Sequence, residues 1–109
     1  MSLTYKVGPS EPVYLPHVEY LGGEAIAGNG ASQACTLETG TQIVLISAEG
    51  GGVQFQLNAE SCPASGAGFV PQDGQVILGP FTNLTSLHVY MASGTTAHLT
   101  YYREREVSG

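Results

Sequence analysis

Short stretches in which apolar and polar residues alternate run through most of this chain, separated by glycine-rich turns. The clearest is VQFQLN at residues 53–58, where every second residue is apolar, which is the period-two pattern of a half-buried strand. The preceding stretch, TQIVLISA at residues 41–48, contains the run from Ile43 to Ile46 and is apolar on both faces. Such a run is typical of a strand covered from two sides. No stretch of useful length has the period of a helix.

The turn EGGG at residues 49–52 links these two stretches and predicts a β-hairpin. With those four residues as the loop, the apolar faces of the two strands coincide. The same register leaves Ile43 and Leu45 on the opposite face, beside glutamines of the second strand. Exposed Ile and Leu side chains need a cover, and we expect either a second subunit or the N-terminal segment to supply it.

A second hairpin is predicted from SLHVYM at residues 86–91 and AHLTYY at residues 97–102. Between the two hairpins, a loop at residues 59–74 leads into a short strand at 75–78. Pairing the apolar residues of the second hairpin builds one apolar face. The other face then carries His88, Tyr90, His98, Thr100 and Tyr102.

Residues 1–21 differ from the rest, because three prolines interleave with tyrosines. Proline removes the backbone donor that a central strand needs, so we expect an extended Pro/Tyr-rich arm, followed by one domain at residues 22–109. The apolar side chains of the arm need burial, either on its own domain or on a neighbouring subunit. Tyrosines on strand faces also occur at subunit contacts. The candidate interface residues are Tyr14, Leu15, Ile43, Leu45, Tyr90 and Tyr102.

Composition narrows the class of protein. The chain has 109 residues, 42% of them hydrophobic and 11% charged, which fits one folded domain. Fifteen glycines and six prolines favour an all-β fold. A net charge of -6, with 3 basic residues, lacks the positive field that nucleic-acid binding requires. The run Ile43 to Ile46 is far below the roughly 20 apolar residues of a membrane span, and we expect neither a membrane segment nor an export signal.

Candidate chemistry is sparse. His88 and His98 share a face in the predicted hairpin, but two imidazoles do not make a metal site and no carboxylate or cysteine has a spacing that adds to them. Cys35 and Cys62 are too far apart for a CxxC-type metal or redox motif, and both a reduced pair and a disulfide remain open. We therefore assign no catalytic residue, no metal and no cofactor, and we expect a protein that is not an enzyme.

From about Gly22 to Glu104 the chain resembles small virion structural proteins of tailed bacteriophages. The resemblance lies in GGEAIA at residues 22–27, the stretch at 44–57, the segments FVP and GQVILGP within 69–80, and the final stretch at 87–101. It implies an antiparallel β-sandwich or jelly-roll-like single domain that serves as a capsid decoration (cement) protein or as a tail accessory protein. It also implies scaffolding in place of catalysis, a homo-oligomer, a major capsid or tail protein as partner, and a location in a virion assembled in the bacterial host cytoplasm.

Three classes of function follow, in order of expectation. The first is a virion structural protein that self-associates as a dimer or trimer. The second is a carbohydrate-binding β-sandwich module, with a shallow groove lined by Tyr90 or Tyr102. The third is a small enzyme, which would need a pocket containing groups with shifted pKa values.

Overall fold

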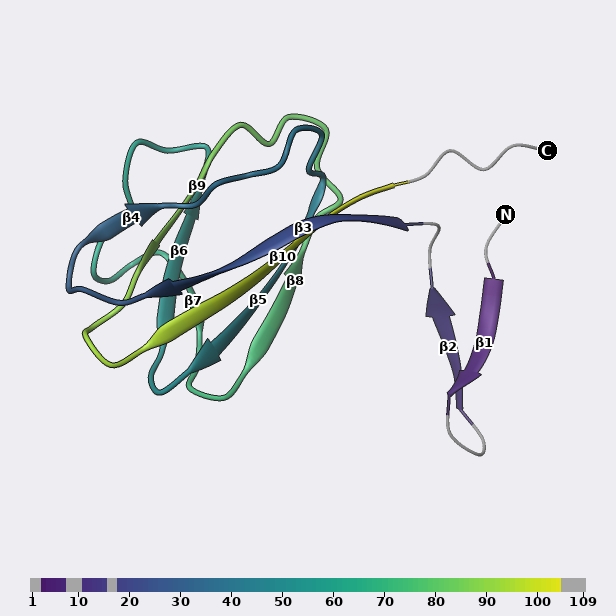
Figure 1. The fold of residues 1–109 in the computed structure, drawn as a ribbon, viewed down its shortest axis with the longest axis horizontal. Coiled ribbons are helices and arrows are strands. Elements are labelled where there is room, and N and C mark those ends of the chain that lie inside the picture. The colour runs from purple at the N-terminus through teal and green to yellow at the C-terminus, as the bar shows by residue number, and fades with distance from the viewer. Residues whose placement is uncertain (1–2, 8–10, 16–17, 105–109) are drawn as a thin grey trace.

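The computed structural model describes the backbone of residues 3–7, 11–15 and 18–104 and the side chains of residues 18–104. Every helix or strand assigned in this part of the chain is a β-strand, so the all-β prediction is confirmed (Figure 1). The strands are β1 (Leu3–Val7), β2 (Glu11–Leu15), β3 (Val18–Ala27), β4 (Ser32–Ala34), β5 (Ile43–Glu49), β6 (Val53–Leu57), β7 (Gly68–Val70), β8 (Gln75–Leu78), β9 (Leu87–Tyr90) and β10 (Thr96–Glu104).

Eight of these strands form two four-stranded antiparallel sheets that enclose one core, in a sandwich-like arrangement (Figure 1). Sheet I has the order β3-β10-β5-β8, and sheet II has the order β4-β9-β6-β7. Strands β1 and β2 pair with each other in a separate two-stranded sheet. From β3 onward, every connection except that between β6 and β7 crosses from one sheet to the other.

Both predicted hairpins are wrong. Strand β5 pairs with β10 and β8, not with β6, and strand β9 pairs with β4 and β6, not with β10. The turns after β5 and β9 therefore connect the two sheets. The reason is that a period of two fixes which face of a strand is apolar, but it does not fix the neighbour. The apolar faces of two strands coincide equally well whether the strands face each other across a core or lie side by side in one sheet.

The faces themselves are confirmed. The buried residues alternate along β5, β9 and β10, as the pattern predicts, and each is at most 3% exposed. The residues from these strands and from the position after β9 are Val44, Ile46, Ala48, Leu87, Val89, Met91, Ala97, Leu99 and Tyr101. Burying one large apolar side chain of this kind contributes about 1.5–3 kcal/mol, so this core holds the two sheets together.

Strand β3 begins at Val18, so the expected boundary between the arm and the domain, at residues 21 and 22, lies inside this strand. It pairs with β10 over its whole length, with a bulge opposite the step from Tyr101 to Tyr102. The small residues of this segment permit a close approach: a Cβ atom on Gly23 would lie 2.8 Å from the backbone oxygen of Leu99. The segment Val18–Ala27, whose small residues give only a weak strand pattern in the sequence, is therefore an edge strand of sheet I.

Candidate functional site

A polar groove lies at the end of the sandwich where the β4–β5 and β8–β9 connections meet the start of β3 and the end of β10. Its volume is about 920 Å³. The charged residues that line it are Glu19, Glu38, Arg103 and Glu104. These residues come from distant parts of the chain, and the sequence analysis missed the groove because no local motif marks it.

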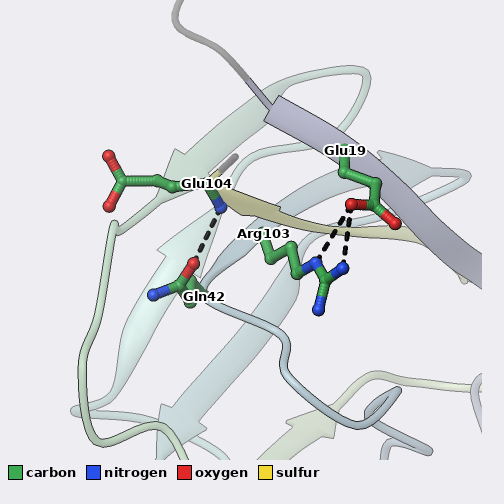
Figure 2. A network of polar contacts seen from close by, with 4 residues as sticks. All are labelled: Glu19, Gln42, Arg103 and Glu104. Carbon is green, nitrogen blue, oxygen red and sulfur yellow. Dashed lines mark hydrogen bonds and ion pairs between the residues drawn. The ribbon is translucent and has the colours of Figure 1, made fainter. Parts of the chain in front are cut away.

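The guanidinium group of Arg103 is held in place by its cross-strand neighbour (Figure 2). Its Nε and Nη2 atoms donate to Oε1 of Glu19, at 3.1 and 3.0 Å. The third nitrogen, Nη1, makes no hydrogen bond within the described part of the chain and points away from Glu19 in Figure 2. A Cβ atom on Gly40 would lie 3.9 Å from this nitrogen. The ion pair thus fixes the arginine and leaves one edge of it facing the β4–β5 connection.

Gln42 joins three parts of the groove. Its backbone N–H donates to the carbonyl oxygen of Tyr102 at 2.8 Å, and its own carbonyl oxygen accepts from the backbone N–H of Phe81 at 2.8 Å. Its side-chain Oε1 accepts from the backbone N–H of Glu104 at 2.7 Å (Figure 2). These bonds tie both loops to the end of β10, so the groove walls have a defined separation.

Each loop is also closed on itself or on the sandwich. In the β4–β5 connection, the backbone N–H and the hydroxyl of Thr41 both donate to the carbonyl oxygen of Glu38, at 3.1 and 2.7 Å. This turn places Gly40 at a φ of 89°, in the left-handed region that glycine adopts without strain. The walls of the groove are therefore built before any ligand arrives.

The β8–β9 connection is fixed by Asn58, the residue after β6. Its Oδ1 accepts from the backbone N–H of Thr85 at 2.7 Å and from the Thr85 hydroxyl at 3.0 Å, while its Nδ2 donates to the carbonyl oxygen of Asn83 at 3.1 Å. Asn58 has a φ of 53°, which asparagine tolerates better than most residues.

A second surface is formed by outward-facing residues of sheet I, which we name the apolar face: Tyr20, Ile43, Leu45, Ile77 and Tyr102. The register places Tyr102 between Tyr20 and Ile43, and Leu45 next to Ile77. The Tyr20 and Tyr102 rings pack edge to face, with centroids 6.1 Å apart. Tyr20 and Ile77 are 65% and 67% exposed, and no segment with described side chains covers the apolar face.

The predicted interface residues do not share one surface. Ile43, Leu45 and Tyr102 lie together on the apolar face, whereas Tyr90 points outward from sheet II, where its cross-strand neighbours are Ser32 and Gln54. Since the two sheets have opposite outer surfaces, a single flat contact cannot include both tyrosines. Tyr14 and Leu15 lie in β2, and their side chains are outside the part that the structure describes.

The two histidines were expected on one face, and this expectation is wrong. His88 lies on β9 in sheet II and His98 lies on β10 in sheet I, each on the outer surface of its own sheet. His98 instead contacts Glu49, with 2.7 Å between Nε2 and Oε1. Among residues 18–104, no three His, Cys, Asp or Glu side chains are grouped so as to hold a metal ion.

Cys35 and Cys62 are free thiols. Cys35 lies beside a polar cluster in which the Tyr101 hydroxyl donates to Oε2 of Glu24, and the same oxygen accepts from the backbone N–H of Thr36 at 2.6 Å. Burial, and then the negative charge of Glu24, raise the pKa of Cys35 to about 12. Burial also raises the pKa of Cys62. Both thiols are protonated at neutral pH, so neither is an activated nucleophile.

No protein-family model, no curated protein and no solved structure matches this chain. No helix in the described ranges is long and apolar enough to cross a membrane. The interpretation of the groove and of the apolar face therefore depends on their own geometry and chemistry.

We expect Asn58→Ala to lower the free energy of unfolding by about 1–3 kcal/mol, because it removes the bonds to the β8–β9 connection and places alanine at a positive φ. Asn58→Asp is the matched control, since it keeps the Oδ1 acceptor and should lose less. Urea unfolding followed by circular dichroism measures both variants. Equal losses in the two would show that the Oδ1 bonds do not stabilise this loop.

We expect the protein to lose stability in alkali. The pKa of Cys35 is raised from 9.0 to about 12 in the folded state, so its contribution is complete below pH 9 and is lost as the pH rises towards 12. The loss from this thiol amounts to about 2 kcal/mol between pH 9 and pH 10.5. Urea unfolding at several pH values should give a shallower decline for Cys35→Ser than for the wild type. A parallel decline in both proteins would contradict this assignment.

Proposed function

We propose that this chain is a non-enzymatic structural protein of a tailed-phage virion, of the capsid decoration (cement) type, and that it acts by self-association through the apolar face. The observation that carries the proposal is the exposure of Tyr20 and Ile77 next to Ile43, Leu45 and Tyr102 on one sheet surface. A contiguous apolar surface of this kind marks a contact site in a soluble protein.

The strand order supports the jelly-roll part of the proposal. Two four-stranded antiparallel sheets in the orders β3-β10-β5-β8 and β4-β9-β6-β7, with chain crossings between them, match an eight-stranded jelly roll. Viral capsid domains use this fold, and so do lectins and cupins. Because one fold serves several functions, the fold alone favours a virion protein only by analogy.

A second copy of this chain is the occupant that we assign to the apolar face. Two copies of a chain with a net charge of -6 repel each other, so a self-contact must avoid unpaired charge. The five residues of the apolar face are uncharged. On the same surface, Glu49 of β5 contacts His98, and Glu104 of β10 lies two residues beyond Tyr102, at the end of the strand. Outer sheet surfaces are also flat enough to pack on one another. The face thus suits an isologous contact, in which both copies use the same residues.

The remaining surfaces are available for a major capsid or tail protein. We assign Tyr90, on the outer surface of sheet II, to this second contact. Tyr14 and Leu15 in the N-terminal arm extend the contacts between neighbouring subunits in the proposed assembly. A lattice protein gains its attachment from many modest contacts of this kind.

We expect light scattering after size exclusion at neutral pH to give the mass of a dimer for the wild type, because an isologous contact closes with two copies. Ile77→Lys and Leu45→Lys should give folded monomers, because each puts a charge into the contact. Ile77 is the safer position, since its side chain is already 67% exposed. Gln54→Lys on sheet II is the matched control, because it adds the same charge to the opposite surface. A monomeric wild type, or an unchanged mass in both face variants, would refute self-association through this face.

The virion location has its own test. Particles of the virus that encodes the chain, purified on a density gradient, should contain the protein in a fixed ratio to the major capsid or tail protein, as measured by mass spectrometry. Recovery only in the soluble fraction of the lysate would contradict a structural role in the particle.

A further inference from the structure

The groove at the end of the sandwich has the dimensions of a ligand site and is not used by the proposed self-association. Its volume of about 920 Å³ lies near the upper end of the range of roughly 300–1,000 Å³ for small-molecule sites. Its lining comes mainly from loops fixed on a rigid scaffold, which is where proteins place binding residues. Glu19 and Arg103 both lie next in sequence to apolar-face tyrosines, so their side chains point to the other side of sheet I.

Hydrogen-bond donors and acceptors are mixed along the groove. The donors include Nη1 of Arg103 and Nε2 of Gln42, neither of which makes a hydrogen bond within the described residues. The acceptors include the carboxylate of Glu38, whereas the side chain of Glu104 points away from Arg103 and Glu19 in Figure 2. Threonine hydroxyls on both loops can donate one hydrogen bond and accept others. A ligand made of hydroxyl groups, each of which donates one hydrogen bond and accepts others, can use the whole set.

Apolar side chains interrupt this polar lining. Leu37 and Leu84 line the groove while also packing against the core, and Phe81 lines it from the β8–β9 connection. Such surfaces suit the C–H faces of a sugar ring, which need apolar contact between polar edges. This lining is more selective than a purely polar one, because it requires a ligand that has both polar edges and apolar faces.

The charged residues of the groove disfavour both an anionic ligand and a strongly cationic one. The carboxylates of Glu19 and Glu38 outnumber the single guanidinium of Arg103 in the groove lining, so an anionic ligand would be repelled. A strongly cationic ligand would satisfy the carboxylates but would place like charge beside the free edge of Arg103, which Glu19 holds in position. A neutral ligand avoids both penalties.

We propose that this groove binds a neutral oligosaccharide, with Arg103 and Glu38 as the principal polar contacts and Phe81 as the apolar one. The site differs from the sequence-based expectation of a sugar groove lined by Tyr90 or Tyr102, since neither tyrosine lines the groove. It is also independent of self-association, which uses the opposite side of sheet I.

The test begins with a glycan array that presents neutral and acidic oligosaccharides, probed with wild-type protein. Each neutral glycan that binds is then titrated in solution by calorimetry against the wild type, Arg103→Met and Glu38→Gln. We expect binding of at least one neutral oligosaccharide and at least tenfold weaker affinity in both variants. Gln54→Lys on sheet II should bind as the wild type does. Amide shifts in NMR spectra should map the ligand to residues 38–42 and 81–85, which locates the site even if a variant is poorly folded.

Several outcomes would overturn the proposal. These are no binding to any neutral glycan on the array, binding that both groove variants leave unchanged, and shifts confined to the apolar face or to sheet II. Binding of hexalysine at the groove without any glycan binding would instead assign it to a basic peptide. The Ile77→Lys variant separates this proposal from the previous one, because loss of self-association should leave its solution affinity for the oligosaccharide within about twofold of the wild type.

Discussion

The contact between the inner faces of the two sheets determines most of what this molecule presents to its surroundings. Tyr101 and Leu99 of β10 and Val44 and Ile46 of β5 are buried in the core. Because side chains alternate along a strand, burying these residues turns Tyr102, Leu45 and their neighbours outward. An apolar stripe on the outside of sheet I is therefore a consequence of strands that are apolar on both faces. A fold that only needed a core would place polar residues on that side, so the outward stripe calls for a separate explanation.

The groove depends on the same sandwich in a different way. Its polar side chains come from four segments that the sheets bring to one end: the start of β3, the β4–β5 connection, the β8–β9 connection and the end of β10. Backbone bonds of Gln42 and side-chain bonds of Asn58 fix the loops to strand ends. A hollow made in this way has little to reorganise when a ligand binds, which lowers the entropic cost of binding.

Local pattern predicted the strands but not their partners. The stretches at 41–48, 53–58 and 75–78 all contain strands, since a period of two is visible in a few residues. Pairing is non-local, so the short predicted turns at 49–52 and 92–96 gave no sign that they join opposite sheets. The same error placed His88 and His98 together. Strand β3 was underestimated because its small residues carry little apolar signal, although they are what allows its backbone to approach β10. The groove residues are spread along the chain from Glu19 to Glu104, and no sequence motif connects them.

The two proposed surfaces are compatible, and their combination has a physical consequence. Tyr102 and Arg103 are consecutive on β10 and point to opposite sides of sheet I, so contact between two apolar faces leaves the grooves of both copies open. Single sugar sites bind weakly, because water competes for every hydroxyl group. An assembly that presents two or more grooves on a rigid body converts the later binding events into intramolecular ones and raises the overall avidity without any new contact. Self-association through sheet I would in this way make a weak groove effective on a surface that carries many copies of the same oligosaccharide.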